Sequence, residues 1–111
     1  MTRTLLLLLL LLALAGCSTP LPAERADYAG LWRTADTRLL ITPQGRVEFV
    51  QSRGNGFQKS LKAPLKRFDG DNFVVGLGPI STTFVVSRRP QRGTDGRWTM
   101  TVDGVEYARE D

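Results

Sequence analysis

Apolar and polar residues follow two different patterns along this chain of 111 residues. Residues 5–14 form an unbroken apolar run of leucines with one alanine. From Tyr28 onward, helical periodicity is nearly absent, and short alternating stretches are separated by turn residues at a spacing of about eight to twelve. These patterns predict an apolar leader followed by a single β-barrel-like domain, which we place at residues 28–111.

The tight turns of the β region give its strongest local signals. Asp103-Gly104 lies between two alternating stretches and favours the positive φ angles of a two-residue type I′ turn. Asp69-Gly70-Asp71 is a second tight-turn signal, and Pro64 is expected to interrupt the weak strand before it. Residues 88–96 are expected to form a long loop. The predicted strands, about seven to nine in number, are residues 30–33, 37–42, 46–51, 57–62, 67–68, 72–75, 81–87, 97–102 and 105–109.

Strands joined by hairpins in chain order are expected to form an antiparallel meander. Because open sheet edges invite aggregation, the predicted fold class is all-β, a small antiparallel meander barrel or sandwich. In a barrel of this size, inward side chains fill most of the interior and leave room for at most one small ligand. In the last hairpin, Trp98, Met100 and Val102 are expected on one face, opposite Val105 and Tyr107.

The leader has the features of a signal peptide rather than of a membrane span. Arg3 supplies a positive charge, and the apolar run covers only about half of the ~20 residues that a spanning helix needs. We assign residues 1–16 to the signal peptide. Residues 17–27 contain prolines and little to bury, so they are expected to form the lipidated N-terminus and an extended tether.

Leu14-Ala15-Gly16-Cys17 follows the apolar run directly and consists of a branched apolar residue, two small residues and a cysteine. This stretch resembles the lipobox of bacterial lipoproteins. The resemblance implies cleavage between Gly16 and Cys17, transfer of diacylglycerol to the Cys17 thiol, and acylation of the new amino group. Two or more acyl chains give stable membrane attachment. The alternative is an ordinary secretory signal with an incidental cysteine.

Ser18 follows the cysteine and bears on location. By the sorting rule that the resemblance brings with it, an aspartate at this position retains a lipoprotein at the inner membrane, whereas serine permits transport outward. The expected location is therefore the periplasmic face of the outer membrane, with the membrane itself as a partner through the lipid anchor. Beyond the acyl groups on Cys17, no cofactor is expected.

Gly30-Leu31-Trp32, preceded by Tyr28, opens the first predicted strand. This short stretch resembles the Gly-x-Trp opening of lipocalin-like barrels, and bacterial barrel inhibitors of periplasmic proteases start similarly. The resemblance implies that the tryptophan packs across a closed end of the barrel and that the glycine lets the backbone pass closely. The alternative is that Trp32 is an ordinary core tryptophan.

The residues that most often carry catalysis are missing or occupied. The chain has no histidine, and its one cysteine is Cys17. Lys59 and Ser60 are adjacent on a predicted strand, where neighbours point to opposite faces. Asp69 and Asp71 fit a turn and lack the spacing of a calcium loop. We therefore assign no catalytic residue and no metal site, and we do not expect an enzyme.

The net charge of +4 is spread along the chain, so nucleic acid is not an expected partner. One basic cluster consists of Arg88, Arg89, Arg92 and Arg97, and the first three are a candidate surface for anionic lipid headgroups, peptidoglycan or an acidic protein. The alternative is that these arginines only block the pairing of a sheet edge. A second basic cluster consists of Lys59, Lys62, Lys66 and Arg67.

These observations favour a non-catalytic, membrane-anchored envelope lipoprotein whose β domain binds a protein or another envelope component. The first alternative is an inhibitor of a periplasmic hydrolase, with a loop or the N-terminal segment entering the active site. The second is a carrier of a small ligand, which requires an open apolar cavity. An unfilled interior would favour the carrier, and a filled interior would argue against it.

Overall fold

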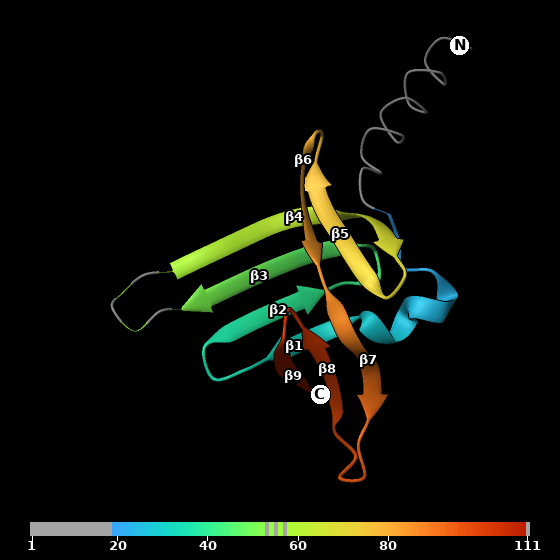
Figure 1. Ribbon diagram of the computed structural model, residues 1–111, viewed down its shortest axis with the longest axis vertical. Helices are drawn as coiled ribbons and strands as arrows, with labels where there is room; N and C mark the ends of the chain where they lie inside the picture. Colours follow the sequence, from blue (N-terminus) through green and yellow to red (C-terminus); the bar gives the residue numbers. More distant parts are fainter. Residues whose placement is uncertain (1–18, 53, 55, 57, 111) are drawn as a thin grey trace, which may run out of the picture.

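The computed structural model describes residues 19–52, 54, 56 and 58–110 and shows an all-β domain, as predicted (Figure 1). The signal peptide, the lipobox and Cys17 lie outside the described residues. A 3-10 helix, η1 (Ala23–Tyr28), precedes nine antiparallel strands in one curled sheet. The strands are β1 (Gly30–Arg33), β2 (Thr37–Ile41), β3 (Arg46–Ser52), β4 (Gln58–Asp69), β5 (Asn72–Leu77), β6 (Ile80–Phe84), β7 (Val86–Arg92), β8 (Trp98–Val102) and β9 (Val105–Glu110).

The strand order in the sheet is β6-β5-β4-β3-β2-β1-β9-β8-β7. The first and last strands of the chain are neighbours, with Leu31 of β1 paired to Glu110 of β9. Strands β6 and β7 lie at the two ends of this order, yet only Val85 separates them in the chain. Figure 1 shows β6 running directly into β7. The two ends of the sheet are thus joined by the chain itself and not by a hydrogen-bonded ladder.

Side-chain oxygens hold the backbone at this junction between β6 and β7. The Val85 N–H donates to Asp103 Oδ1 at 3.0 Å, and the Asp103 N–H donates back to the Val85 carbonyl at 2.7 Å. The Val86 N–H donates to Asn72 Oδ1 at 2.8 Å. Asp103 and Gly104 have φ angles of 49° and 77°, which confirms the predicted type I′ turn.

Strand β4 continues through Pro64, so the predicted interruption there is wrong. Pro64 pairs with Arg46 of β3, whereas the ladder to β5 starts only at Leu65. The Leu65 N–H donates to the Gly45 carbonyl on the β3 side, and alternation therefore turns the nitrogen of Pro64 toward the other side. No ladder bond is needed there, so the missing N–H of proline leaves nothing unpaired.

The predicted loop at 88–96 is also wrong over its first half, because β7 extends to Arg92 and pairs with β8. Its Pro90 is buried, and register shifts accompany it between Arg88 and Gln91. Proline is tolerated here because β7 lies at an end of the sheet and one of its edges has no ladder. In the last hairpin, Met100 pairs with Tyr107 and Val102 with Val105, as expected, and Val105 remains 44% exposed.

Inward-facing side chains fill the curl of the sheet. A row of aromatic rings runs through this core, from Tyr28 through Phe73 to Phe84 and Phe49, with centroid separations of 6.2, 4.8 and 5.8 Å. The Phe73 and Phe84 rings are stacked. The buried core cluster consists of Tyr28, Trp32, Leu39, Ile41, Val47, Leu65, Phe73, Val75, Phe84, Val86, Met100, Val102 and Tyr107.

The described part of the predicted tether is fastened to the domain. The Thr19 N–H donates to the Leu65 carbonyl at 3.1 Å, and the Leu21 N–H donates to the Pro43 carbonyl at 3.0 Å. The side chain of Leu21 packs against the core. Gly45 makes this docking possible, since a Cβ there would lie 1.9 Å from the Thr19 carbonyl oxygen. Residues 19–27 therefore belong to the domain and do not form a free spacer.

Candidate functional site

Two regions of the curl differ in how completely the strands enclose the core. We call the first the Trp–Arg cluster, which consists of Trp32, Trp98 and Arg109. Trp32 is fully buried and donates its indole N–H to the Tyr28 carbonyl at 2.9 Å. The guanidinium carbon of Arg109 lies 5.7 Å from the centre of the Trp32 ring and 4.7 Å from that of Trp98. These distances are typical of cation–π contacts.

Gly30 lies beside this cluster at a φ angle of 144°. A Cβ at this position would lie 2.5 Å from Cδ of Arg109. The close approach at Gly30 is therefore made by the side chain of Arg109, whereas the resemblance implied a close passage of the backbone. This arginine, which the sequence analysis did not single out, covers the inner tryptophan.

We call the second region the open seam, which lies between residues 59–63 of β4 and 80–84 of β6. Residues 58–64 of β4 pair with β3 only, because the ladder to β5 begins at Leu65. Strand β6 pairs with β5 only. Within the described sheet, each of these two segments therefore has one edge without a ladder.

Two shallow depressions lie along the open seam and share Leu61 and Thr82 in their linings. The larger has a volume of about 250 Å³ and the smaller about 160 Å³. The larger is lined by Phe49, Lys59, Ser60, Leu61, Thr82, Phe84 and Asp103. Its floor is thus apolar, and its rim carries one positive and one negative side chain. This combination fits an extended peptide, whose backbone pairs with a strand edge while alternate side chains enter the depression.

The two end strands of the sheet, β6 and β7, differ in how well their sequences discourage pairing with a strand of another protein. Strand β7 carries Arg88, Arg89, Pro90 and Arg92, and charge together with proline discourages edge pairing. Strand β6 carries the sequence Ile-Ser-Thr-Thr-Phe, which has neither charge nor proline. The edge that faces the open seam is therefore the less protected of the two.

The candidate anionic-surface residues lie together on β7, and two of them bind the domain itself. Arg89 donates to the Glu24 carbonyl at 3.1 Å, and its Nε lies 3.6 Å from Asp71 Oδ1. The Nε of Arg92 donates to the Gly96 carbonyl at 3.2 Å. Arg88 is exposed on the same strand. These contacts give Arg89 and Arg92 a structural role beside the surface role predicted for them.

The second basic cluster of the sequence is not brought together. Lys59 lines the open seam. The Nζ of Lys62 is 3.8 Å from Glu48 Oε1, and Lys62 also lines the smaller depression. Lys66 donates to the Gly78 carbonyl at the tip of the β5–β6 hairpin. Lys59 and Lys62 therefore border the open seam, whereas Lys66 contacts the hairpin tip.

The two tyrosines serve the core rather than proton transfer. Burial raises the pKa of Tyr28 above its ordinary value of 10.0, and the neighbouring Asp71 carboxylate adds to this effect. Its hydroxyl donates to the Asp71 carbonyl at 2.8 Å. Burial likewise raises the pKa of Tyr107. Both side chains are therefore neutral at physiological pH and supply no general base.

The floor of the open seam was missed by the sequence analysis. Phe49, Leu61 and Phe84 were assigned to strands, but nothing in the local sequence shows that β4 and β6 do not pair with each other.

Among the described residues, no group of acidic or cysteine side chains has the arrangement of a metal site. In the same part of the chain, no helix has the length and apolar character to cross a bilayer. Comparison with protein-family models, curated proteins and solved structures found no match to this chain.

Proposed function

We propose that this protein is a non-catalytic envelope lipoprotein whose β domain binds an extended segment of a partner protein in the open seam. Acylated Cys17 anchors it at the periplasmic face of the outer membrane. The observation that carries the binding role is the pair of uncharged or weakly charged strand edges that flank an apolar floor. The lipobox Leu14-Ala15-Gly16-Cys17 supports the anchor.

A peptide fits the open seam better than a small ligand does. The larger depression, about 250 Å³, is below the roughly 300–1,000 Å³ of typical small-molecule pockets. The core beneath it is filled by buried side chains. Strand edges, in contrast, offer a row of N–H and C=O groups, and an added strand satisfies them along its whole length. A small ligand is therefore not favoured as the occupant of the open seam.

Photo-crosslinking in living cells tests the binding role. A benzophenone side chain replaces Thr82, which lines both depressions, and as a control it replaces Ser87, which is exposed on β7. We expect a discrete protein adduct from position 82 and none from position 87. Leu61→Glu places a charge in the floor and should abolish the adduct, whereas Arg67→Glu, at an exposed position of β4 outside both depressions, should leave it.

Equal adducts from the two positions, or an adduct indifferent to Leu61→Glu, would overturn binding at the open seam. The anchor is tested separately by mass spectrometry of the mature N-terminal peptide. We expect Cys17 as the first residue, carrying acyl chains on sulfur and nitrogen, and a Cys17→Ala variant that is not acylated. An unmodified thiol on the mature chain would refute the anchor.

A further inference from the structure

We propose that the tip of the β5–β6 hairpin inserts into the lipid bilayer beside the anchor and holds the domain in one orientation. This proposal rests on the lipid anchor proposed above and adds a second membrane contact. The residues at the tip are Leu77 and Ile80, with the turn Gly78-Pro79 between them. Figure 1 shows this hairpin crossing β4 and projecting beyond the sheet.

The apolar face of the hairpin continues from the core into solvent. Paired residues share a face, and three successive inward pairs are Phe73 with Phe84, Val75 with Thr82, and Leu77 with Ile80. The first pair is buried at 1% and 4% exposure, whereas the last is 62% and 76% exposed. Leu77 and Ile80 are thus apolar side chains on the inward face of the hairpin, at the end that extends past the buried core.

The hairpin also lacks the charges that keep other surface elements in water. The chain has no charged residue from Asn72 to Phe84. The ammonium group of Lys66 contacts the tip, where it donates to the Gly78 carbonyl. If the tip is inserted, the ammonium group of Lys66 lies at the level of the headgroups, where it can contact anionic lipid. An apolar tip with a flanking cation is the arrangement expected of an interfacial anchor.

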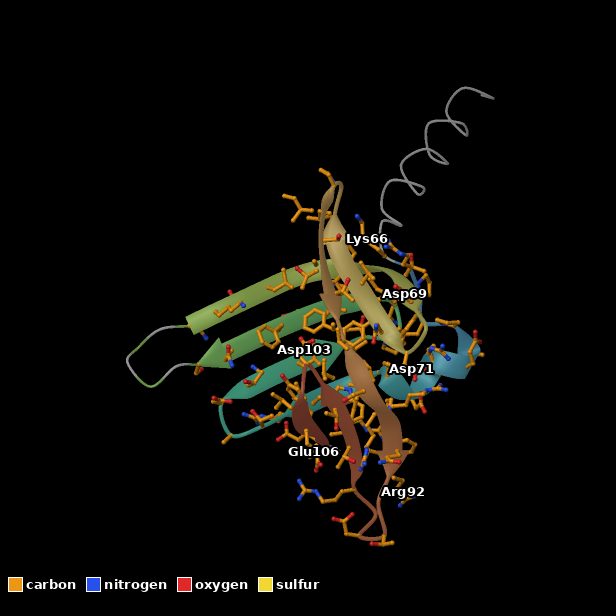
Figure 2. The ribbon with its side chains drawn as sticks, viewed as in Figure 1. Lys66, Asp69, Asp71, Arg92, Asp103 and Glu106 are labelled. Carbon is orange, nitrogen blue, oxygen red and sulfur yellow. The ribbon has the colours of Figure 1, made fainter. Side chains whose placement is uncertain are left out.

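The described N-terminus leaves the domain at the same end as the tip. The hydroxyl of Thr19 donates to the Lys66 carbonyl at 3.3 Å, and Lys66 in turn contacts the tip. Cys17 precedes Thr19 by two residues, a span of at most about 7 Å. Figure 2 shows Lys66 beside the β5–β6 hairpin and Arg92 at the opposite end of the molecule. An acylated Cys17 therefore brings the bilayer to the end of the domain where Leu77 and Ile80 are exposed.

Depth measurements in vesicles test the insertion. The full lipidated protein is reconstituted at about one copy per vesicle in phosphatidylethanolamine and phosphatidylglycerol, so that a second copy cannot cover the tip. Nitroxide labels are placed through Ile80→Cys, and through Thr94→Cys in the β7–β8 loop as a control, since the thiol of Cys17 is acylated. We expect the label at position 80 to be accessible to oxygen and shielded from a water-soluble nickel reagent, and the label at 94 to show the reverse.

A second variant connects the depth to the apolar side chains. Full burial of a large aliphatic side chain favours the inserted state by about tenfold or more. Leu77→Asp should therefore lower the ratio of inserted to free tip by at least about tenfold. The label at position 80 should then become more accessible to the nickel reagent. The exposed position of Leu77 lets this variant fold, and a circular dichroism spectrum identical to that of the parent verifies it.

The results separate the insertion from the anchor. Flotation of the protein with vesicles while position 80 is as water-accessible as position 94 would overturn the insertion and leave the anchor intact. Failure to float would remove the anchor and the insertion with it. Ile80 also borders the open seam, so a protein adduct at this position is compatible with the insertion. A benzophenone at position 80 that captures no lipid in cells would overturn the proposal.

Discussion

The Trp–Arg cluster and the open seam lie in the same curled sheet, but the strands enclose only one of them. Around the cluster, β2, β1, β9 and β8 form consecutive ladders, and the guanidinium group of Arg109 packs over the Trp32 ring. At the seam, β4 separates from β5 beyond Leu65 and faces β6 without a ladder. The ladders are therefore continuous around the cluster, whereas at the seam they leave unpaired strand edges, which carry no charge on β6.

The largest effect is expected at the Trp–Arg cluster. Trp32→Ala removes a fully buried side chain and should lower the free energy of unfolding by about 3–5 kcal/mol. Leu61→Ala at the open seam removes a partly buried side chain and should cost less than half of that value. Urea unfolding of the two variants measures both quantities. Equal losses would mean that the seam is packed as firmly as the cluster.

A substitution at Gly45, in the turn between β2 and β3, tests how firmly residues 19–21 are held against the domain. Gly45→Ala should cost about 1 kcal/mol for a side chain at positive φ, and about 1–3 kcal/mol more for the clash with the Thr19 carbonyl. Gly70→Ala is the matched control, since Gly70 also has positive φ but a Cβ there would meet open space. Hydrogen exchange of the Thr19 and Leu21 amides should accelerate only in Gly45→Ala. Similar exchange in both variants would show that the segment does not depend on Gly45.

A smaller loss is expected at the junction between the two ends of the sheet. Asp103→Ala removes the acceptor of the Val85 N–H and should lower stability by about 1 kcal/mol. Asp103→Asn keeps an oxygen at that position and should retain most of the stability. If both variants lost the same amount, the charge of Asp103, and not its hydrogen bond, would hold the junction.

The smallest effect is expected at the hairpin tip. Replacing Leu77 and Ile80 together by serine should change the free energy of unfolding in detergent-free buffer by no more than about 0.5 kcal/mol, because both side chains are already exposed. Thermal unfolding monitored by circular dichroism checks this value. A loss above 1 kcal/mol would place the tip with the core and contradict its assignment to the membrane contact.

Local sequence signals predicted the all-β fold and its turns correctly. Features that depend on residues far apart in the sequence were not predicted. Asp103-Gly104 fixed the last hairpin because its turn geometry is a property of the residues themselves. Pro64 and Pro90 were misjudged because a proline is tolerated only where an edge has no ladder, which the sheet order decides. The docking of Thr19 beneath Gly45 and the separation of β4 from β6 likewise depend on segments far apart in sequence.

The pairing of β1 with β9 sets the order in which this domain can be completed. Leu31 meets Glu110, so the first strand lacks one of its neighbours until the last residues have been delivered. Contacts between such distant residues slow folding, because a long loop must close before they form. Until then the domain cannot be complete, because β1 has only β2 beside it.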